Sequence, residues 1–167
     1  MTINYFAYGS NLSSFRLLQR LPEAEVSGIA TLEAHQLCWR KNGTDDSGKC
    51  DMAHTGNQGD VVYGVVYRMT LPEQEKLDEI ESAGFGYERR NISIYRISGE
   101  KIDAFTYFAL DIDHNKQPYH WYKEHVLRGA IEHEFPEDYV ERIRATIAIE
   151  DQDLARHQRE MSIYTTA

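Results

Sequence analysis

Apolar residues recur with two different periodicities along the chain, and these periodicities predict which segments form strands and which form helices. Alternating or continuous runs of β-branched and aromatic residues predict strands at 3–8, 28–40, 61–69, 88–97 and 102–110. The last two flank Ser98-Gly99-Glu100-Lys101, which is typical of a hairpin turn. Residues 41–60 are rich in Gly, Asp, Asn, Ser and Thr, which predicts a long loop and leaves open a short strand near 52–54.

Helices are predicted where apolar residues recur every three or four positions. One such segment covers 13–20 and another covers 71–82. The second follows Thr70-Leu71-Pro72-Glu73, which has the Thr-x-x-Glu form of a capping box with proline in the first turn. Two further helices are expected to begin at Gln117-Pro118 and at Phe135-Pro136.

The order of these elements indicates the fold class. Strands cluster early and helices late, with one helix between them, which favours α+β over an alternating parallel sheet. We expect a small mixed, mostly antiparallel β-barrel or strongly curled sheet with helices packed outside. The 167 residues fit a single domain spanning 1–167. Its charged residues at about 150–167 are expected to form a peripheral, solvated helical tail.

Composition and charge narrow the possible partners. Hydrophobic residues make up 41% and charged residues 27% of the chain, as in soluble globular proteins. A formal net charge of −9 argues against nucleic acid, because phosphate binding needs a basic surface. No apolar run approaches membrane-spanning length and no basic, apolar leader opens the chain, so no membrane partner is expected.

Cysteines and histidines predict neither a disulfide framework nor a metal site. The two cysteines, Cys38 and Cys50, are expected to be free thiols in a reducing compartment, which predicts a cytoplasmic protein. The seven histidines show no closed ligand pattern such as His-Glu-x-x-His. No metal and no cofactor is therefore expected.

The opening segment carries the first candidate chemistry. A strand breaks at Gly9-Ser10-Asn11 and passes directly into a helix, which Ser10, Asn11 or Ser13 is expected to cap. Unpaired N–H groups and the helix dipole would favour an anion there, either a phosphate or a carboxylate. Gly9 would let that ligand approach the backbone closely. An ordinary strand–helix connection has the same pattern, so the residues alone leave both interpretations open.

The string Tyr8-Gly9-Ser10-Asn11 resembles the opening motif of the γ-glutamylcyclotransferase family. In that family the loop holds the glutamyl end of the substrate. The resemblance implies a substrate-binding role for the whole segment: Tyr5, Phe6, Ala7, Tyr8, Gly9, Ser10 and Asn11.

Glu81 is the second candidate, because it breaks two local rules. It lies four residues after Leu77, on the apolar face of its predicted helix, whereas Glu75, Asp78 and Glu79 are expected in solvent. It also lies in the last turn, where the helix dipole disfavours a negative charge. Such violations are expected at functional sites, and a general acid or base is one such function. Pairing with a nearby arginine such as Arg89 or Arg90, or a frayed helix end, stays an alternative.

The same family places its catalytic glutamate after a GVVY-type strand and a Leu-Asp-x-x-Glu segment. Here Gly64-Val65-Val66-Tyr67 precedes Leu77-Asp78-Glu79-Ile80-Glu81, so the resemblance implies that Glu81 is the catalytic base. The family usually continues with glycine, whereas Ser82-Ala83-Gly84 follows here and delays the turn by two positions.

Three tyrosines extend the resemblance. Tyr87 follows Phe85-Gly86, Tyr107 lies in Ala104-Phe105-Thr106-Tyr107-Phe108, and Tyr122 follows Pro118, each resembling a segment of the family. The resemblance implies that these three residues contact substrate. Packing within the sheet or the helix is the alternative role for each.

Together these features predict a γ-glutamyl cyclotransferase acting on a small-molecule γ-glutamyl substrate. Glu81 would free the substrate's α-amine to attack its own γ-carbonyl, releasing 5-oxoproline and an amine or amino acid. Two alternatives stay open: an amidase with a Glu81-activated water, and a non-catalytic module that binds a small metabolite. The sequence indicates neither the leaving group nor the oligomeric state.

Overall fold

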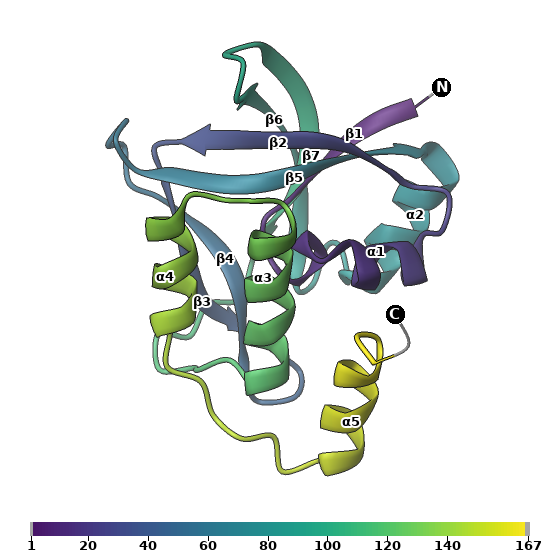
Figure 1. Ribbon diagram of the computed structural model, residues 1–167, viewed down its shortest axis with the longest axis vertical. Helices are drawn as coiled ribbons and strands as arrows, with labels where there is room; N and C mark the ends of the chain where they lie inside the picture. The colour runs from purple at the N-terminus through teal and green to yellow at the C-terminus, as the bar shows by residue number, and fades with distance from the viewer. Residues whose placement is uncertain (1, 166–167) are drawn as a thin grey trace.

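A closed five-stranded barrel forms the centre of the computed structural model, which describes residues 2–165 (Figure 1). Neighbouring strands are antiparallel except β1 and β7, which pair in parallel at Tyr5 and Phe105. The α+β barrel expected from the sequence is therefore confirmed. In barrel order the strands are β1 (Thr2–Ala7), β5 (Val61–Thr70), β2 (Glu25–Glu33), β6 (Tyr87–Arg96) and β7 (Lys101–Ala109).

A second, two-stranded sheet corrects two expectations from the sequence. The single strand predicted at 28–40 is broken at Ala34, whose φ of 57° ends β2 and starts β3 (His35–Asn42). The predicted long loop at 41–60 carries β4 (Gly48–His54), which pairs with β3 and includes the short strand that the sequence left open near 52–54. Asp51 interrupts the apolar pattern by which β4 would be recognised in the sequence. In the structure its side chain is buried and accepts a 2.9 Å hydrogen bond from Arg40 Nε.

The predicted helices are present, with short adjustments at their ends. The predicted capping box is confirmed: Glu73 Oε2 accepts from the Thr70 backbone N–H at 2.9 Å, and Thr70 Oγ1 accepts from the Glu73 N–H at 3.4 Å. α3 and α4 lie side by side against the barrel, and the segment Ser10–Leu12 forms a 3₁₀ turn before α1 (Figure 1). The helices are α1 (Ser14–Arg20), α2 (Leu71–Ile80), α3 (His120–Glu132), α4 (Glu137–Ala145) and α5 (Leu154–Ser162).

Gly129 of α3 fixes the position of the N-terminal loop. A Cβ at this position would lie 2.4 Å from the carbonyl carbon of Leu12 and from the backbone nitrogen of Ser13. Only glycine therefore lets α3 pack directly on the backbone that follows the Tyr8–Asn11 segment. Leu12 is fully buried at this contact, which ties the loop to the hydrophobic core.

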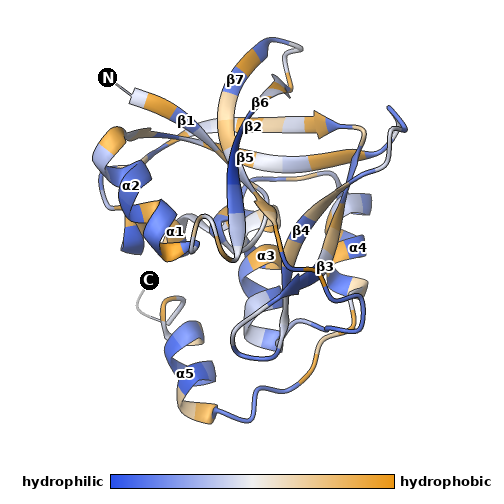
Figure 2. Cartoon of the chain, turned by 180° about the vertical axis from the view of Figure 1, so that it is seen from behind, coloured by the Kyte–Doolittle hydropathy of each residue, from blue (hydrophilic) through white to orange (hydrophobic). Residues whose placement is uncertain are grey.

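The C-terminal tail is more firmly anchored than its charge suggests. Most of α5 is hydrophilic, as Figure 2 shows, and none of its residues is buried. The tail is nevertheless held by polar contacts: Glu160 pairs with Arg16 and with His125, and Tyr164 donates to Ser13 Oγ at 3.0 Å. The expected helix is present over 154–162 and none of its residues is buried, as expected for a solvated helix, but the sequence did not predict these polar contacts with Ser13, Arg16 and His125. The last two residues of the expected tail, 166 and 167, lie outside the described residues.

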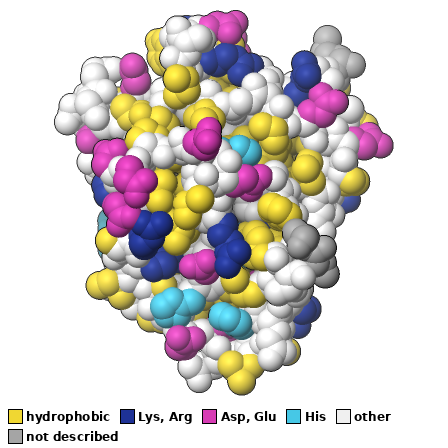
Figure 3. All heavy atoms as spheres, in the orientation of Figure 1, with side chains coloured by type: hydrophobic (Ala, Val, Ile, Leu, Met, Phe, Trp, Pro, Cys, Tyr) yellow, Lys and Arg dark blue, Asp and Glu magenta, His cyan; other side chains and the backbone are white. Residues whose placement is uncertain are grey.

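Acidic and basic side chains lie intermixed over the face drawn in Figure 3. Within residues 2–165, no helix is both long enough and apolar enough to span a bilayer.

Candidate active site

A small cavity of about 30 Å³ lies where the N-terminal loop meets the end of α2. It brings together eight of the residues singled out from the sequence, although they come from five separate parts of the chain. The lining residues are Tyr8, Gly9, Ser10, Asn11, Cys50, Glu81, Tyr87, Tyr107 and Tyr122.

The N-terminal loop supplies unpaired backbone donors to this region. Leu12 N–H bonds the Gly9 carbonyl at 2.9 Å, which closes the 3₁₀ turn. The N–H groups of Gly9, Ser10 and Asn11 donate no hydrogen bond to any acceptor within residues 2–165. All three residues line the cavity. Adjacent N–H groups without an acceptor beside a cavity favour an anionic or carbonyl oxygen.

The expected side-chain cap on this helix start is absent from the described structure. Gly9 is the N-cap of the 3₁₀ turn and Ser13 the N-cap of α1, and neither makes a capping hydrogen bond through its side chain. Ser13 Oγ instead accepts from Tyr164. This prediction was wrong because tertiary partners compete for the same polar side chains.

Asn11 joins the loop to Glu81. Its Nδ2 donates to Glu81 Oε1 at 3.0 Å and to Tyr5 Oη at 3.2 Å, while its Oδ1 accepts from Arg20 Nη1 at 3.2 Å. Both ends of this buried amide are therefore occupied, which fixes its orientation. Arg20 Nη1 also lies 3.9 Å from Glu81 Oε1, so a positive charge stands close to the carboxylate.

Glu81 is the C-cap residue of α2 and its side chain is 18% exposed. Its backbone N–H donates to the Leu77 carbonyl at 2.9 Å, and Leu77 is fully buried beneath it. Ile80, the other apolar residue of the predicted face, is 38% exposed, so the buried stripe of α2 is narrower than expected. The turn that follows places Ser82 at φ 51° and Gly84 at φ 92°, which is the delayed glycine turn seen in the sequence.

The sequence predicted Asp78 in solvent, but its carboxylate is held by two other side chains. Its Oδ1 accepts from Tyr107 Oη at 2.7 Å, and its Oδ2 pairs with Arg89. Asp78 precedes Glu81 by three residues, so the two carboxylates lie on the same side of α2. That spacing is the signal through which the sequence could have revealed it. Asp78 does not line the cavity itself but holds the hydroxyl of Tyr107, which does.

Three of the tyrosine hydroxyls on the cavity wall are held by backbone groups. Tyr8 donates to the Tyr107 carbonyl at 2.6 Å and Tyr87 to the Cys50 carbonyl at 2.8 Å, while Tyr122 Oη accepts from the Cys50 N–H at 3.0 Å. Burial raises the pKa of Tyr8, Tyr87 and Tyr122 well above the usual value, so all three stay neutral. They form a rigid neutral wall around Glu81.

Tyr5, Phe6 and Ala7 do not line the cavity. Phe6 and Ala7 are fully buried in the barrel, and Phe6 packs against the backbone of Gly64, where a Cβ would lie 2.4 Å from the ring. Tyr5 reaches the site through its hydrogen bond with Asn11 and through an edge contact with the Tyr107 ring, whose centroid lies 5.9 Å away. These three residues therefore support the loop from behind.

The sequence did not single out Cys50 or Arg20 as part of the site. Cys50 lines the cavity from β4, the strand that the sequence left as an option within a loop. Burial raises the pKa of its thiol far above the usual value, so the thiol stays protonated. Arg20 ends α1, and only the fold shows that its guanidinium lies beside Asn11 and Glu81.

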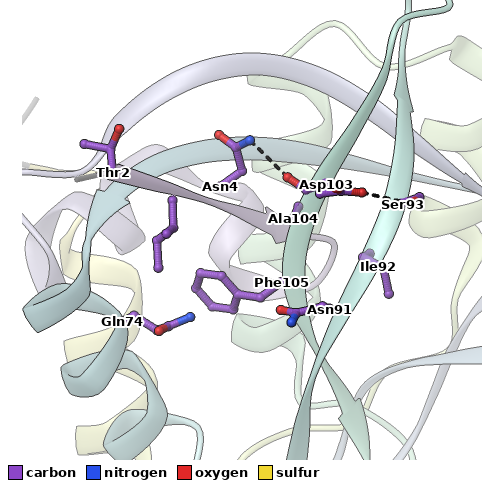
Figure 4. Close-up of a pocket in the computed structure, with 10 residues that line it drawn as sticks. Thr2, Asn4, Gln74, Asn91, Ile92, Ser93, Asp103, Ala104 and Phe105 are labelled. Atoms are coloured by element: carbon purple, nitrogen blue, oxygen red, sulfur yellow. Dashed lines mark hydrogen bonds between the residues drawn. The ribbon is translucent and has the colours of Figure 1, made fainter.

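A larger cavity of about 630 Å³ opens elsewhere, between β1, α2, β6 and β7 (Figure 4). Asp103 is the one ionisable residue lining it, and Ser93 donates to this carboxylate at 3.0 Å. Asn4, Gln74 and Asn91 contribute neutral amides to its wall. Size alone would favour this cavity as the site, whereas the carboxylate, free donors and tyrosines converge on the smaller one. Within residues 2–165, no cluster of three or more His, Cys, Asp or Glu residues is arranged to hold a metal ion.

Comparison with known proteins identifies the family of the chain. A family model described as the AIG2-like family matches residues 61–143. The chain is 31% identical over 151 residues to a γ-glutamylcyclotransferase from Mus musculus, covering 86% of this chain and 78% of that protein. It is 30% identical over 148 residues to a γ-glutamylcyclotransferase from Homo sapiens, covering 84% and 77% respectively. A solved structure described as a γ-glutamyl cyclotransferase has the same fold, with a TM-score of 0.87 over 99% of each chain and 24% identity. The chain therefore belongs to the AIG2-like, γ-glutamylcyclotransferase family.

Proposed function

We propose that this protein is a γ-glutamyl cyclotransferase that releases 5-oxoproline and an amine or amino acid from a γ-glutamyl amide. The observation that carries the proposal is the position of Glu81, a partly buried carboxylate held by Asn11 at 3.0 Å beside a loop with three free N–H groups. A base and a set of oxyanion donors on one wall are the two elements that intramolecular acyl transfer needs.

Glu81 would act on the substrate's amine. Its carboxylate would accept a proton from the α-ammonium group, and the freed nitrogen would attack the γ-carbonyl carbon of the same glutamyl group. The new C–N bond closes a five-membered ring, and the oxygen of the tetrahedral intermediate carries the negative charge. When the bond to the leaving nitrogen breaks, Glu81 would give that proton to the leaving nitrogen. The ring nitrogen still carries two protons, and Glu81 would accept the second one to leave the lactam N–H. Transfer of this second proton to the departing amine, which leaves as an ammonium, returns Glu81 to its carboxylate form and balances the reaction.

The N–H groups of Gly9, Ser10 and Asn11 would receive the oxygen that becomes negatively charged, or the glutamyl carboxylate. The neutral tyrosine wall would exclude water and hold the substrate in the folded conformation that ring closure requires. Because the nucleophile is already part of the substrate, the mechanism needs neither a metal nor a covalent enzyme intermediate. The predicted cytoplasmic location would keep Cys50, which lines the site, as a free thiol.

Two other functions fit the same cavity. In an amidase, Glu81 would activate a water molecule and the product would be glutamate. A non-catalytic module would bind a γ-glutamyl compound without changing it.

Incubation with a panel of γ-glutamyl amino acids and amines, followed by detection of products, separates the three. Free 5-oxoproline that depends on the protein supports the proposal. Glutamate in its place supports the amidase, and binding without either product supports the third function.

A further inference from the structure

The ammonium group of Lys49 is enclosed by three aromatic rings, one of which belongs to the cavity wall. Lys49 lies in β4, and its side chain is 15% exposed. Its Nζ lies 4.7 Å from the ring centroid of Trp121, 4.8 Å from that of Tyr122 and 5.7 Å from that of Tyr119. All three distances fall within the roughly 6 Å over which a cation is attracted to an aromatic face. We call these three rings, which stand at the start of α3, the aromatic cage.

Two polar partners hold the ammonium group of Lys49 in place. Its Nζ donates to Asp45 Oδ2 at 2.7 Å and to Ser47 Oγ at 2.7 Å. Ser47 Oγ in turn donates to Asp45 Oδ1 at 2.8 Å, so the three groups hold one another. Burial lowers the pKa of Lys49, and the hydrogen bond and charge of Asp45 partly offset this effect. Because the cation is largely desolvated, its attraction to the rings is stronger than it would be at an exposed position.

Two rings of the aromatic cage are fixed through their own polar atoms. Tyr119 Oη donates to the Asp45 carbonyl at 2.8 Å. Trp121 Nε1 donates to Asp151 Oδ2 at 2.7 Å, and Asp151 is itself buried. The cage is therefore a rigid frame beside the third ring, that of Tyr122.

Consecutive residues of β4 hold the ring and the hydroxyl of Tyr122. The Lys49 ammonium lies over the ring, and the Cys50 N–H donates to Oη at 3.0 Å. The hydrogen bond fixes one atom of the side chain, whereas the contact over the ring also fixes the plane of that ring. Trp39 packs edge-on against the same ring, with the centroids 6.3 Å apart. The ammonium contact depends on charge, so it can be removed with little change in shape.

Tyr122 connects this arrangement to the proposed chemistry. Lys49 itself does not line the cavity, but Tyr122 and Cys50 do. A Cβ at Gly9 would lie 3.4 Å from Tyr122 Oη, so the hydroxyl lies against the loop that carries the free N–H groups. A shift of the Tyr122 ring would therefore change the shape of the cavity next to that loop.

We propose that Lys49 is a positioning residue, which acts on the reaction by holding the Tyr122 ring in the orientation that folds the substrate for ring closure. This inference rests on the proposed cyclotransferase function and adds a residue outside the cavity to its machinery. Ring closure requires the α-amine to approach the γ-carbonyl carbon of the same glutamyl group, so a fixed wall raises kcat. The loop N–H groups and Glu81 would still bind the substrate without Lys49, so KM should change little.

Lys49→Met tests the proposal, because methionine has a similar length but no charge. The substrate is whichever of γ-glutamyl-L-alanine and γ-glutamyl-ethylamide the wild-type protein cyclises faster. We expect kcat to fall by roughly tenfold or more and KM to change by less than about threefold. Lys116→Met is the matched control, since it removes an ion pair with Asp46 from the same turn and should change neither quantity. Lys49→Gln takes the place of Lys49→Met if that variant does not fold.

A double-mutant cycle shows whether Lys49 acts through Tyr122. Tyr122→Leu removes the ring, so Lys49→Met should lower the rate much less in that background than in the wild type. Single-turnover formation of 5-oxoproline measures the four rates, at a temperature where thermal melting shows every variant folded. Tyr122→Met is the second choice if Tyr122→Leu does not fold.

Four outcomes would contradict the inference. Equal losses of rate in both backgrounds would mean that Lys49 does not act through Tyr122. An unchanged kcat in folded Lys49→Met, with or without a lower melting temperature, would leave Lys49 a purely structural role. A rise in KM without a fall in kcat would place its effect on substrate binding. If wild-type protein forms no 5-oxoproline from either compound, the proposed function itself fails, and this inference fails with it.

Discussion

The side-chain amide of Asn11 donates a 3.0 Å hydrogen bond to Glu81 Oε1 and so links two segments that lie 70 residues apart. The same amide is fixed by Tyr5 and Arg20, so the direction of its N–H toward the carboxylate is determined by its surroundings. Asn11 therefore acts as a positioning residue for the proposed base. A base held by a fixed neighbour loses little freedom when the substrate binds.

Asn11→Ala should lower kcat by roughly tenfold or more while changing KM little, because it frees Glu81 without removing it. It should also cost about 1 to 3 kcal/mol of stability, since Tyr5 and Arg20 lose a buried partner. Steady-state kinetics well below the melting temperature of the variant measures the first effect. Asn91→Ala, an exposed residue of the larger cavity, is the control and should change neither quantity. An effect of Asn11→Ala on stability alone would make its role purely structural.

Glu81→Gln tests the base directly. The amide keeps the shape of the side chain but cannot accept the proton, so turnover should fall by at least about a hundredfold. Circular dichroism and thermal melting should show an intact fold. Glu79→Gln removes an exposed carboxylate from the same helix and should be close to neutral. If Glu81→Gln turns over at nearly the wild-type rate, another group is the base.

Cys50 fills the space beside Gly9, so a larger residue at position 9 should lower stability rather than only block a ligand. From the sequence, the space beside Gly9 was expected to receive a ligand, but a Cβ there would lie 2.9 Å from Cys50 Cβ. Gly9→Ala should therefore lower stability by about 1 to 3 kcal/mol through overpacking, and activity should fall with it. Adding Cys50→Gly removes the clashing atoms, so the double variant should lose less stability than the sum of the two single variants. Additive losses in denaturant unfolding would show that the two positions do not interact.

The sequence predicted the barrel because its strands alternate apolar and polar residues. It left β4 only as a possible short strand near 52–54, because Lys49 and Asp51 interrupt that pattern. Burial of Asp51 depends on Arg40, a partner that only the hairpin brings close. The sequence likewise identified Glu81 from its four-residue spacing to Leu77. The hydrogen bond from Asn11 to Glu81 depends on a loop and a helix that meet only after folding.

The contacts of Glu160 in α5 with Arg16 and His125 should make the stability of the protein depend on pH. Burial lowers the pKa of His125 from 6.5 to about 4. Burial opposes ionisation of Glu160, but the hydrogen bond from His125 and the charge of Arg16 outweigh it and lower the pKa of Glu160 to about 2. Between pH 6.5 and 4 the unfolded chain binds a proton at His125 that the folded protein does not bind. The contribution of His125 to the free energy of unfolding is therefore fully present above pH 6.5 and is lost as the pH falls toward 4.

Glu160 acts in the same direction at lower pH: its contribution to the free energy of unfolding is fully present above pH 4.5 and is lost as the pH falls toward 2.

Denaturant unfolding should show the protein on the order of 2 kcal/mol less stable at pH 4.5 than at pH 7.5 because of His125. His125→Gln should be less stable at pH 7.5 and should show a smaller difference between the two pH values. A pH dependence equal to that of the wild type would assign the titration to other groups.

The proposed mechanism makes the substrate's own α-amine the nucleophile, so N-acetylation of the glutamyl group should abolish the reaction. Acetylation ties up the nitrogen lone pair in an amide and removes the proton that Glu81 would accept. An amidase that attacks with water has no such chemical requirement, although it could still discriminate by fit. Release of the leaving amine is therefore followed from matched free and N-acetylated compounds, with the binding of each measured separately by calorimetry. We expect amine release from the free compound alone, even at concentrations where the acetylated compound binds. Steady amine release from the acetylated compound, with N-acetylglutamate as the second product, would replace cyclisation by hydrolysis as the activity of this site.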